Sequence, residues 1–409
     1  MNPRLERLQP YPFERLRELM QGVVPNPALR PIALSVGEPR HATPTFIKEA
    51  LTRHLSGLSH YPATLGSDSL RAALAHWLQT RFALPSLDPA TEVLPTLGSR
   101  EALFSLTQVL MDPDRAEARA VCPNPFYQIY EGATLLAGGQ PWFVNADPAR
   151  GFCVDYSTVP ETVWQNTQVV FTCSPGNPPG RVMTLEEWRT LFELSDRYGF
   201  VIVSDECYSE IYPDESRPPL GSLQAAALLG RTGYPRLIAM GSLSKRSNVP
   251  GMRSAYAAGD RTLLKQFALY RTYHGSAMNP AVQAASEAAW QDETHVQDNR
   301  RQYREKMEAF YALVHPHLPL DRPEAGFYYW ARTPIADTEF ARGLMRDAHV
   351  SVLPGSLLAR HAHGSNPGQD RIRIALVGTL DETLEAAHRL VAFTHTLQEH
   401  AHVLATSPD

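Results

Sequence analysis

Short apolar runs alternate with segments of helical periodicity between residues 91 and 260. The apolar runs predict strands, and most are followed by a stretch whose apolar residues recur every three to four positions. Thr184 and Glu187 have the spacing of a capping box, which marks the start of a helix. This alternation predicts a parallel sheet covered by helices. The predicted strands span residues 91–98, 118–123, 169–173, 201–208 and 236–245, and the predicted helices span 99–111, 126–139 and 184–199.

The pattern changes after about residue 285, where a long polar helix is predicted first. Three apolar segments then predict strands, and a final amphipathic segment predicts a C-terminal helix. Those strands span 325–332, 350–356 and 371–378. We therefore expect a large domain followed by a smaller α+β domain, which the start of the chain joins. The expected bounds are 1–45 for the joining segment, 46–284 for the large domain and 285–409 for the small domain.

Composition excludes several classes of protein. The chain has 409 residues, 43% hydrophobic and 20% charged, which is typical of a folded chain with two domains. The net charge of -5 provides no basic excess for nucleic acid or an anionic membrane. Membrane spans, a secretory signal, a disulfide framework and a metal site are not indicated either. The four cysteines form no CxxC pair, so a reducing cytoplasm is the expected location.

Lysine is scarce, since only four of the 38 basic residues are lysines. A lysine retained in such a chain raises the question of whether an amine that can lose its proton and attack a carbonyl is required there. Lys48, Lys265 and Lys306 lie in helical or carboxylate-rich segments, and a solvated surface position is favoured for them. Lys245 differs, because its segment is small, polar and bounded by glycine and proline.

Polar residues collect where the predicted strands end. In a parallel sheet these positions meet at one edge, where ligands of open α/β folds bind. They combine an amine that can form an imine, a carboxylate that can pair with a pyridine nitrogen, and hydroxyls beside a helix start that can bind phosphate. This set indicates a pyridoxal-phosphate site, and no nucleotide-binding glycine motif is present. The residues are Gly98, Ser99, Asn177, Asp205, Tyr208, Ser242, Ser244 and Lys245, with Arg253 close in sequence.

Eight motifs in order resemble the class I and II aminotransferases, pyridoxal-phosphate enzymes of fold type I. The resemblance covers nearly the whole chain and implies a large domain with a mostly parallel seven-stranded sheet beside a smaller α+β domain. The motifs are VGEP (36–39), YPATLGSDSLR (61–71), GSRE (98–101), PNPFYQIY (123–130), SPGNPPG (174–180), SDECY (204–208), SLSKRSNVPGMR (242–253) and RIRIALV (371–377).

The resemblance also implies a role for each matched residue. Lys245 matches the lysine that forms the Schiff base, Asp205 the partner of the pyridine nitrogen, and Tyr208 the third catalytic residue. The implied cofactor-binding residues are Gly98, Ser99, Arg100, Tyr127, Asn177, Asp205, Tyr208, Ser242, Ser244, Lys245 and Arg253, with Tyr61 contributed across a homodimer. The implied substrate-binding residues are Gly37, Asn177 and Arg373. Phe126 competes with Tyr127, and Arg371 competes with Arg373.

Two segments, SNVPG after Lys245 and 270–286, are most similar to the N-succinyl-diaminopimelate aminotransferases of proteobacteria. This similarity implies amino transfer between N-succinyl-LL-2,6-diaminopimelate and 2-oxoglutarate in lysine biosynthesis. An aspartate, alanine or other aminotransferase and a pyridoxal-phosphate lyase on the same fold are the alternatives. A regulator that uses the fold as an effector sensor is disfavoured, because the roughly 35 residues before VGEP are too few for a DNA-binding domain.

Overall fold

The computed structural model describes residues 1–406 and the side chains of residues 1–399. Its main element is a seven-stranded sheet. In spatial order its strands are β2 (Val93–Thr96), β8 (Ala255–Gly259), β7 (Leu237–Ser242), β6 (Val201–Asp205), β5 (Thr167–Cys173), β3 (Arg119–Asn124) and β4 (Gln140–Asn145). β8 runs antiparallel to both neighbours, whereas the other adjacent pairs are parallel. The mostly parallel seven-stranded sheet is thus confirmed.

Both faces of this sheet are buried because successive residues of the central strands point in opposite directions. In β6, Ile202 joins one hydrophobic cluster while Val201 and Val203 join the other. The first cluster includes α2 (Thr45–Arg53), α3 (Asp68–Phe82), α6 (Glu161–Trp164), α7 (Leu185–Tyr198), α8 (Ser222–Leu228) and α11 (Pro280–Trp290). The second includes α4 (Ser99–Leu110), α5 (Ile129–Leu136) and α10 (Arg261–His274).

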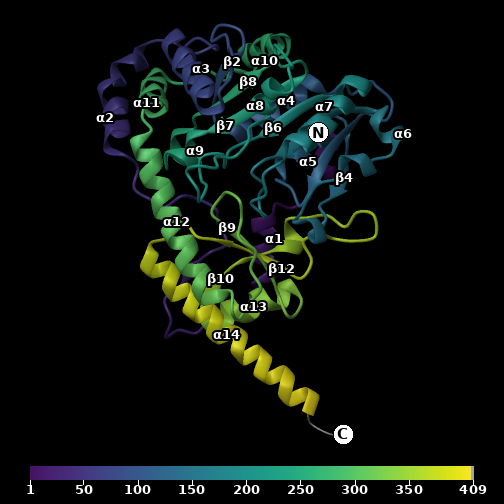
Figure 1. Ribbon diagram of the computed structural model, residues 1–409, viewed down its shortest axis with the longest axis vertical. Helices are drawn as coiled ribbons and strands as arrows, with labels where there is room; N and C mark the ends of the chain where they lie inside the picture. Colours follow the sequence, from purple (N-terminus) through teal and green to yellow (C-terminus); the bar gives the residue numbers. More distant parts are fainter. Residues whose placement is uncertain (407–409) are drawn as a thin grey trace.

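A second, smaller layer lies below the large sheet in Figure 1. Its antiparallel sheet has the order β11 (Leu353–Pro354), β12 (Arg371–Ala375), β9 (Tyr328–Arg332). From the start of the chain, β1 (Ile32–Ala33) pairs in parallel with β10 (Val350–Ser351). Three helices pack against these strands and contribute to the hydrophobic core of this layer: α12 (Thr294–Val314), α13 (Asp337–Ala348) and α14 (Leu380–Thr406). α12 runs from the region of the large sheet into this layer, where α14 lies beside it (Figure 1).

Short elements complete the chain. They include α1 (Pro12–Leu19) and α9 (Leu243–Arg246), a single helical turn that follows β7. The 3₁₀ helices are Pro3–Arg7, Leu55–Ser59, Pro148–Arg150, Tyr156–Thr158, Pro250–Met252 and Gly355–Leu357.

The predicted elements exist, and their ends differ. α7 begins after Thr184 with the predicted capping box. The strand predicted over 236–245 ends at Ser242, and the next four residues form α9. β4 and β8 had no predicted counterpart.

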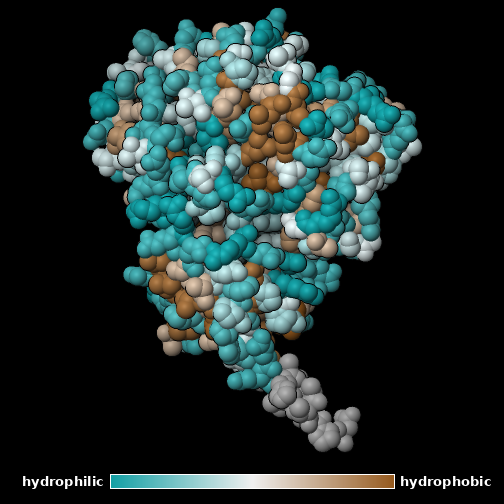
Figure 2. Space-filling view, in the orientation of Figure 1, coloured by the Kyte–Doolittle hydropathy of each residue, from teal (hydrophilic) through white to brown (hydrophobic). Residues whose placement is uncertain are grey.

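The surface in Figure 2 is mostly hydrophilic, and its largest hydrophobic group lies in the upper half, over the region of the large sheet. Within residues 1–406, no helix combines the length and the apolar character needed to span a membrane. The domain bounds at 45/46 and 284/285 stay a prediction.

Candidate active site

A cavity of about 630 Å³ opens at the carboxyl ends of β5, β6 and β7. This is the edge of an open α/β sheet where ligands bind. The start of α4, β12 of the smaller sheet and two parts of the N-terminal segment complete its wall. All predicted site residues except Gly98 and Tyr61 line it: Gly37, Ser99, Arg100, Tyr127, Asn177, Asp205, Tyr208, Ser242, Ser244, Lys245, Arg253 and Arg373.

Lys245 extends into this cavity from α9. Its Nζ donates a hydrogen bond to the Gly37 carbonyl oxygen. Burial lowers the pKa of Lys245 to about 8, and the nearby guanidinium of Arg373 acts in the same direction. Lys245 therefore loses its proton far more readily than a surface lysine, and the neutral amine is the form that attacks a carbonyl.

Asp205 ends β6 and is only 5% exposed. The Tyr130 hydroxyl donates to one carboxylate oxygen at 3.0 Å, and the Cys207 N–H donates to the other at 3.3 Å. Burial raises the pKa of Asp205, because these neutral donors do not replace the water that the carboxylate has lost. A buried carboxylate with neutral donors is well suited to a cationic ligand group.

The start of α4 and the segment after β7 form a cup for an anion. α4 starts at Ser99 without a side-chain cap, so its first N–H groups are available. Gly98 has a φ of +89°, and a Cβ there would lie 2.2 Å from an Arg253 Nη atom. Glycine therefore lets this guanidinium approach the helix start. Ser242 and Ser244 add two hydroxyls whose Oγ atoms lie 2.9 Å apart.

Arg373 lies on β12 at the opposite wall. One Nη donates to Asn177 Oδ1 at 3.1 Å, and the other donates to the Ser35 carbonyl at 2.9 Å. Its buried Nε has no hydrogen-bond partner within the described residues. The competing Arg371 lies against the Phe152 ring instead, at 4.6 Å from the ring centroid. Each Nη uses only one of its two N–H bonds in these contacts, so Arg373 keeps donors for a ligand carboxylate.

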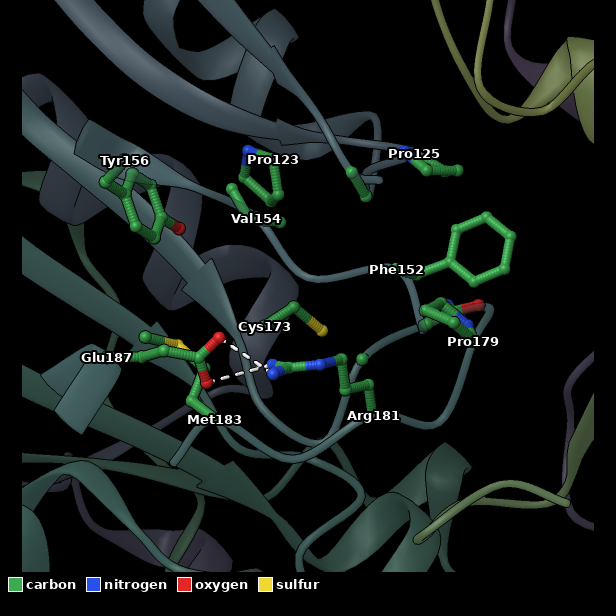
Figure 3. A pocket seen from close by; sticks show the side chains of 13 residues that line it. Pro123, Pro125, Phe152, Val154, Tyr156, Cys173, Pro179, Arg181, Met183 and Glu187 are labelled. Carbon is green, nitrogen blue, oxygen red and sulfur yellow. Dashed lines mark hydrogen bonds and ion pairs between the residues drawn. The ribbon is translucent and has the colours of Figure 1, made fainter. Parts of the chain in front are cut away.

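A second cavity of about 50 Å³ lies beside the turn that carries Asn177, and Arg181 and Glu187 are among its lining residues (Figure 3). Arg181 and Glu187 form a bidentate ion pair there, with N–O distances of 2.7 and 3.0 Å. Cys173 and Asn177 line both cavities. The small cavity therefore adjoins the main cavity at the turn that carries Asn177.

Tyr127 and Phe126 both line the main cavity. Phe126 is buried and packs against Phe143, with ring centroids 4.8 Å apart. The Tyr127 hydroxyl instead accepts a hydrogen bond from Arg100 Nε, and a second Arg100 nitrogen lies 3.4 Å from the Tyr11 hydroxyl. These contacts support Tyr127 as the aromatic group that faces the ligand.

Several residues of the wall were not predicted. The Tyr328 hydroxyl lies 2.9 Å from the Tyr208 hydroxyl, and Tyr11 reaches the cavity from the segment before α1. Tyr328 pairs with Ala375, two positions from Arg373 on β12, so Tyr328 and Arg373 lie on the same face of the smaller sheet. The sequence around Tyr11 carries no signal that places it in the wall. Leu358 also lines the cavity, so the segment of residues 354–360, which follows β11, reaches it.

Two predicted positions differ from the rest. Tyr61 lies outside the cavity, and its side chain is fully exposed. Lys306 was expected on a solvated surface, and this expectation is wrong, since Lys306 is only 3% exposed. The carboxylates beside it in sequence suggested a surface helix, but α12 turns this lysine inward.

The residues of the cavity fit the cofactor that the resemblance implies. Asp205 supplies a buried carboxylate with neutral donors, and Lys245 an amine with a lowered pKa. Among the described residues, no carboxylate pairs with Arg100, Arg253 or Arg373, whose hydrogen bonds go to hydroxyl, carbonyl and amide oxygens. The cavity is thus suited to a ligand with a phosphate, a carboxylate and a basic ring nitrogen.

The pH dependence of cofactor binding by the apoenzyme tests whether the pKa of Lys245 is lowered. We expect the rate at which the apoenzyme captures added pyridoxal phosphate to rise with pH, to reach half its maximum near pH 8 and to level off above about pH 9, where nearly all of the Lys245 amine is neutral. Stopped-flow absorbance at several pH values measures this rate. A rate that still rose tenfold between about pH 9 and 10 would indicate an ordinary lysine.

The comparisons with known proteins agree with this geometry. Residues 30–390 match the family model "Aminotransferase class I and II". The LL-diaminopimelate aminotransferase of Aquifex aeolicus is 31% identical over 95% of this chain and 97% of its own length. An aminotransferase structure from Neisseria meningitidis is 50% identical with a TM-score of 0.94, covering 96% of this chain and all of the other.

A probable N-succinyldiaminopimelate aminotransferase from Thermus thermophilus is 26% identical with a TM-score of 0.81, covering 93% of this chain and 100% of the other. Together with the cavity, the match to the family model over most of the chain settles the assignment. The chain belongs to the class I and II aminotransferases, a family that depends on pyridoxal phosphate.

Proposed function

We propose that this aminotransferase moves an amino group between N-succinyl-LL-2,6-diaminopimelate and 2-oxoglutarate, in lysine biosynthesis in the cytoplasm. The observation that carries the proposal is a cavity in which Lys245 and Asp205 lie beside three guanidinium groups without carboxylate partners among the described residues. Such a cavity favours substrates with more than one carboxylate. The names of the relatives from Aquifex aeolicus and Thermus thermophilus support a diaminopimelate compound.

In the proposed reaction, Lys245, Asp205 and Arg373 have different roles. Bound pyridoxal phosphate supplies an aldehyde that reacts with amines and a ring that withdraws electrons. Lys245 Nζ holds the cofactor at rest and then moves a proton from the substrate Cα, for which a pKa near neutrality is favourable. Asp205 keeps a proton on the ring nitrogen. Arg373 orients the substrate α-carboxylate through two nitrogens.

The other residues hold the cofactor in place. Arg253, with the hydroxyls and backbone N–H groups of the cup, binds the phosphate. Tyr208 and Asn177 would donate to the phenolic oxygen of the cofactor ring, and Tyr127 would cover the ring face. Arg100 is left to neutralise a further anionic group, on the phosphate or at the distal end of the substrate.

A comparison of amino donors tests which substrate this aminotransferase prefers. The purified holoenzyme is assayed for glutamate formation from 2-oxoglutarate with N-succinyl-LL-diaminopimelate, LL-diaminopimelate, aspartate or alanine as the amino donor. We expect kcat/KM for the succinylated donor to exceed the others at least about tenfold, which corresponds to one well-placed contact. A preference for LL-diaminopimelate, or for aspartate or alanine, would reject the succinylated substrate. Release of product without glutamate would indicate a lyase.

We further propose a homodimer that completes each cavity with Tyr61 from the partner subunit. Tyr61 belongs to a group of exposed large hydrophobic side chains. These side chains lie on two segments, residues 55–65 and residues 269–273. A hydrogen bond of 3.4 Å between the hydroxyls of Thr64 and Thr272 joins the two segments. An exposed apolar patch of this kind is typical of a subunit interface. The other members are Leu55, Leu58, Leu65, Leu269 and Tyr273.

Mixed dimers test the shared site. We expect Tyr61→Phe to weaken cofactor binding, because it removes a hydroxyl from the phosphate, and Lys245→Ala to be inactive. A dimer with one subunit of each kind pairs the intact Lys245 of one subunit with the intact Tyr61 of the other. Mixing the two proteins should therefore restore about one normal site per mixed dimer, as measured by cofactor titration and activity. Sedimentation as a monomer, or no gain on mixing, would contradict the shared site.

A further inference from the structure

Lys306 lies behind the cavity wall in a buried polar cluster. From α12, its Nζ donates to His41 Nε2 at 2.7 Å and to the Gly378 carbonyl at 2.8 Å. The Tyr303 ring lies 4.4 Å from the same nitrogen. Lys306 therefore joins three elements: α12, the segment before α2 and the segment after β12.

The hydrogen-bond pattern fixes the state of His41. Asn299 Nδ2 donates to the Lys245 carbonyl at 3.1 Å, so Asn299 Oδ1 is the end that faces His41 Nδ1, at 2.7 Å. His41 Nδ1 must then carry the hydrogen, and Nε2 accepts from Lys306. Burial and the charge of Lys306 lower the pKa of His41 to about 4, so the ring is neutral at neutral pH. A chain of hydrogen bonds thus runs from Lys306 through His41 and Asn299 to the backbone of Lys245.

His41 also lies near the end of a segment that passes through the site, residues 32–43, which we call the strap. At its start, Leu34 O accepts from the Ala375 N–H of β12 at 2.8 Å. In its middle, Ser35 O accepts from Arg373, and Gly37 O accepts from Lys245. At its end, the Thr43 hydroxyl donates to the Asn248 carbonyl at 2.9 Å.

The strap packs closely against Tyr328 at Gly37. A Cβ at this glycine would lie 1.8 Å from the Tyr328 hydroxyl oxygen. The carbonyls of Ser35 and Gly37 thus meet Arg373 and Lys245 between the two held ends of the strap. The charged groups that face the cluster are Arg40 and Glu382, which pair at 3.0 Å, and Asp298 on α12.

We propose that Lys306 and His41 act as a pair of positioning residues that hold the strap in register with the Lys245 amine and Arg373. This inference rests on the roles proposed for Lys245 and Arg373 and goes beyond them, since neither Lys306 nor His41 lines the cavity. Because misplacement of a catalytic group by about 1 Å can lower a rate about 100-fold, a distant pair can control the reaction.

Two variants and their combination test the pair. Lys306→Met keeps a flexible chain without the donors, and His41→Phe keeps a ring against Tyr303 without the nitrogens. Lys48→Met, at an exposed lysine, is the matched control. The readouts are kcat and KM, the pH midpoint at which the visible band of the lysine-bound cofactor titrates, and the melting temperature.

We expect each variant to shift the pH midpoint and to lower kcat/KM on the order of 10-fold to 100-fold. Because the two residues act as a unit, the double variant should be no worse than the poorer single variant. Lys48→Met should match the wild type. An unchanged midpoint and unchanged kinetics with a lower melting temperature would overturn the proposal, as would additive losses in the double variant.

The same experiment separates this proposal from the proposed function. The pH midpoint needs no substrate, so it reports on Lys245 even if the substrate assignment is wrong. Should Lys306→Met fail to fold, His41→Phe alone decides between the two outcomes, because His41 is only partly buried.

Discussion

Replacing Lys245 by alanine is expected to lower turnover on the order of 10⁴-fold or more. The substitution removes both the amine that binds the cofactor and the group that moves the Cα proton. No second amine lines the cavity among the described residues, so nothing nearby can take over. Steady-state kinetics with glutamate and 2-oxoglutarate measure the loss, and the visible spectrum should lose the band of the lysine-bound cofactor.

Two control variants separate charge from nucleophilicity. Lys245→Arg keeps a cation at this position but cannot lose its proton, so we expect it to be nearly as inactive as alanine. Lys48→Ala changes an exposed lysine and should leave turnover unchanged. Turnover within tenfold of the wild type for Lys245→Ala would rule out its catalytic role.

Replacing Asp205 by alanine should lower kcat on the order of 10³-fold, with a folded protein retained. In the proposed site this carboxylate would face the ring nitrogen from a buried position, and burial makes its electrostatic effect large. Its loss removes the charge that keeps that nitrogen protonated. Single-turnover kinetics of the glutamate half-reaction isolate this step from product release.

Two further variants make the interpretation specific. Asp205→Glu restores the charge at a shifted position and should recover part of the activity. Tyr130→Phe removes the hydrogen bond of 3.0 Å to the carboxylate and should cost far less than the loss of the charge. If Asp205→Ala and Tyr130→Phe had equal effects, the carboxylate would be structural rather than catalytic.

The large sheet was predictable because its central strands are short, apolar and buried on both faces. β5 and β6 follow this pattern and were located from it. β8 was not, since its sequence AYAAG lacks the branched residues that indicate a strand, and the sheet around it determines its conformation. β7 was predicted too long, because it ends at Ser242, whose side chain accepts from the Ser244 N–H and starts the helical turn that carries Lys245.

The site was predictable where each residue lies at the end of a strand. Asp205, Asn177 and Lys245 meet in the cavity for that reason. The sequence pattern does not reveal contacts between distant segments. For this reason Tyr11 was not predicted in the site, and Lys306 was wrongly expected on the surface. The neighbours of Lys306 in sequence are charged, but its partners are His41 and Gly378, which lie 265 and 72 positions away.

Identification of the lysine that carries the cofactor is the most direct test. Borohydride reduction of the holoenzyme fixes pyridoxal phosphate to its lysine, and peptide mass spectrometry locates it. Lys306 is the informative control for Lys245, because burial and Arg40 lower the pKa of Lys306 to about 7 while its side chain lies outside the cavity. We predict one pyridoxyl group per chain on Lys245 and none on Lys306. A label on Lys306, or no label on any lysine, would contradict the assignment of the site.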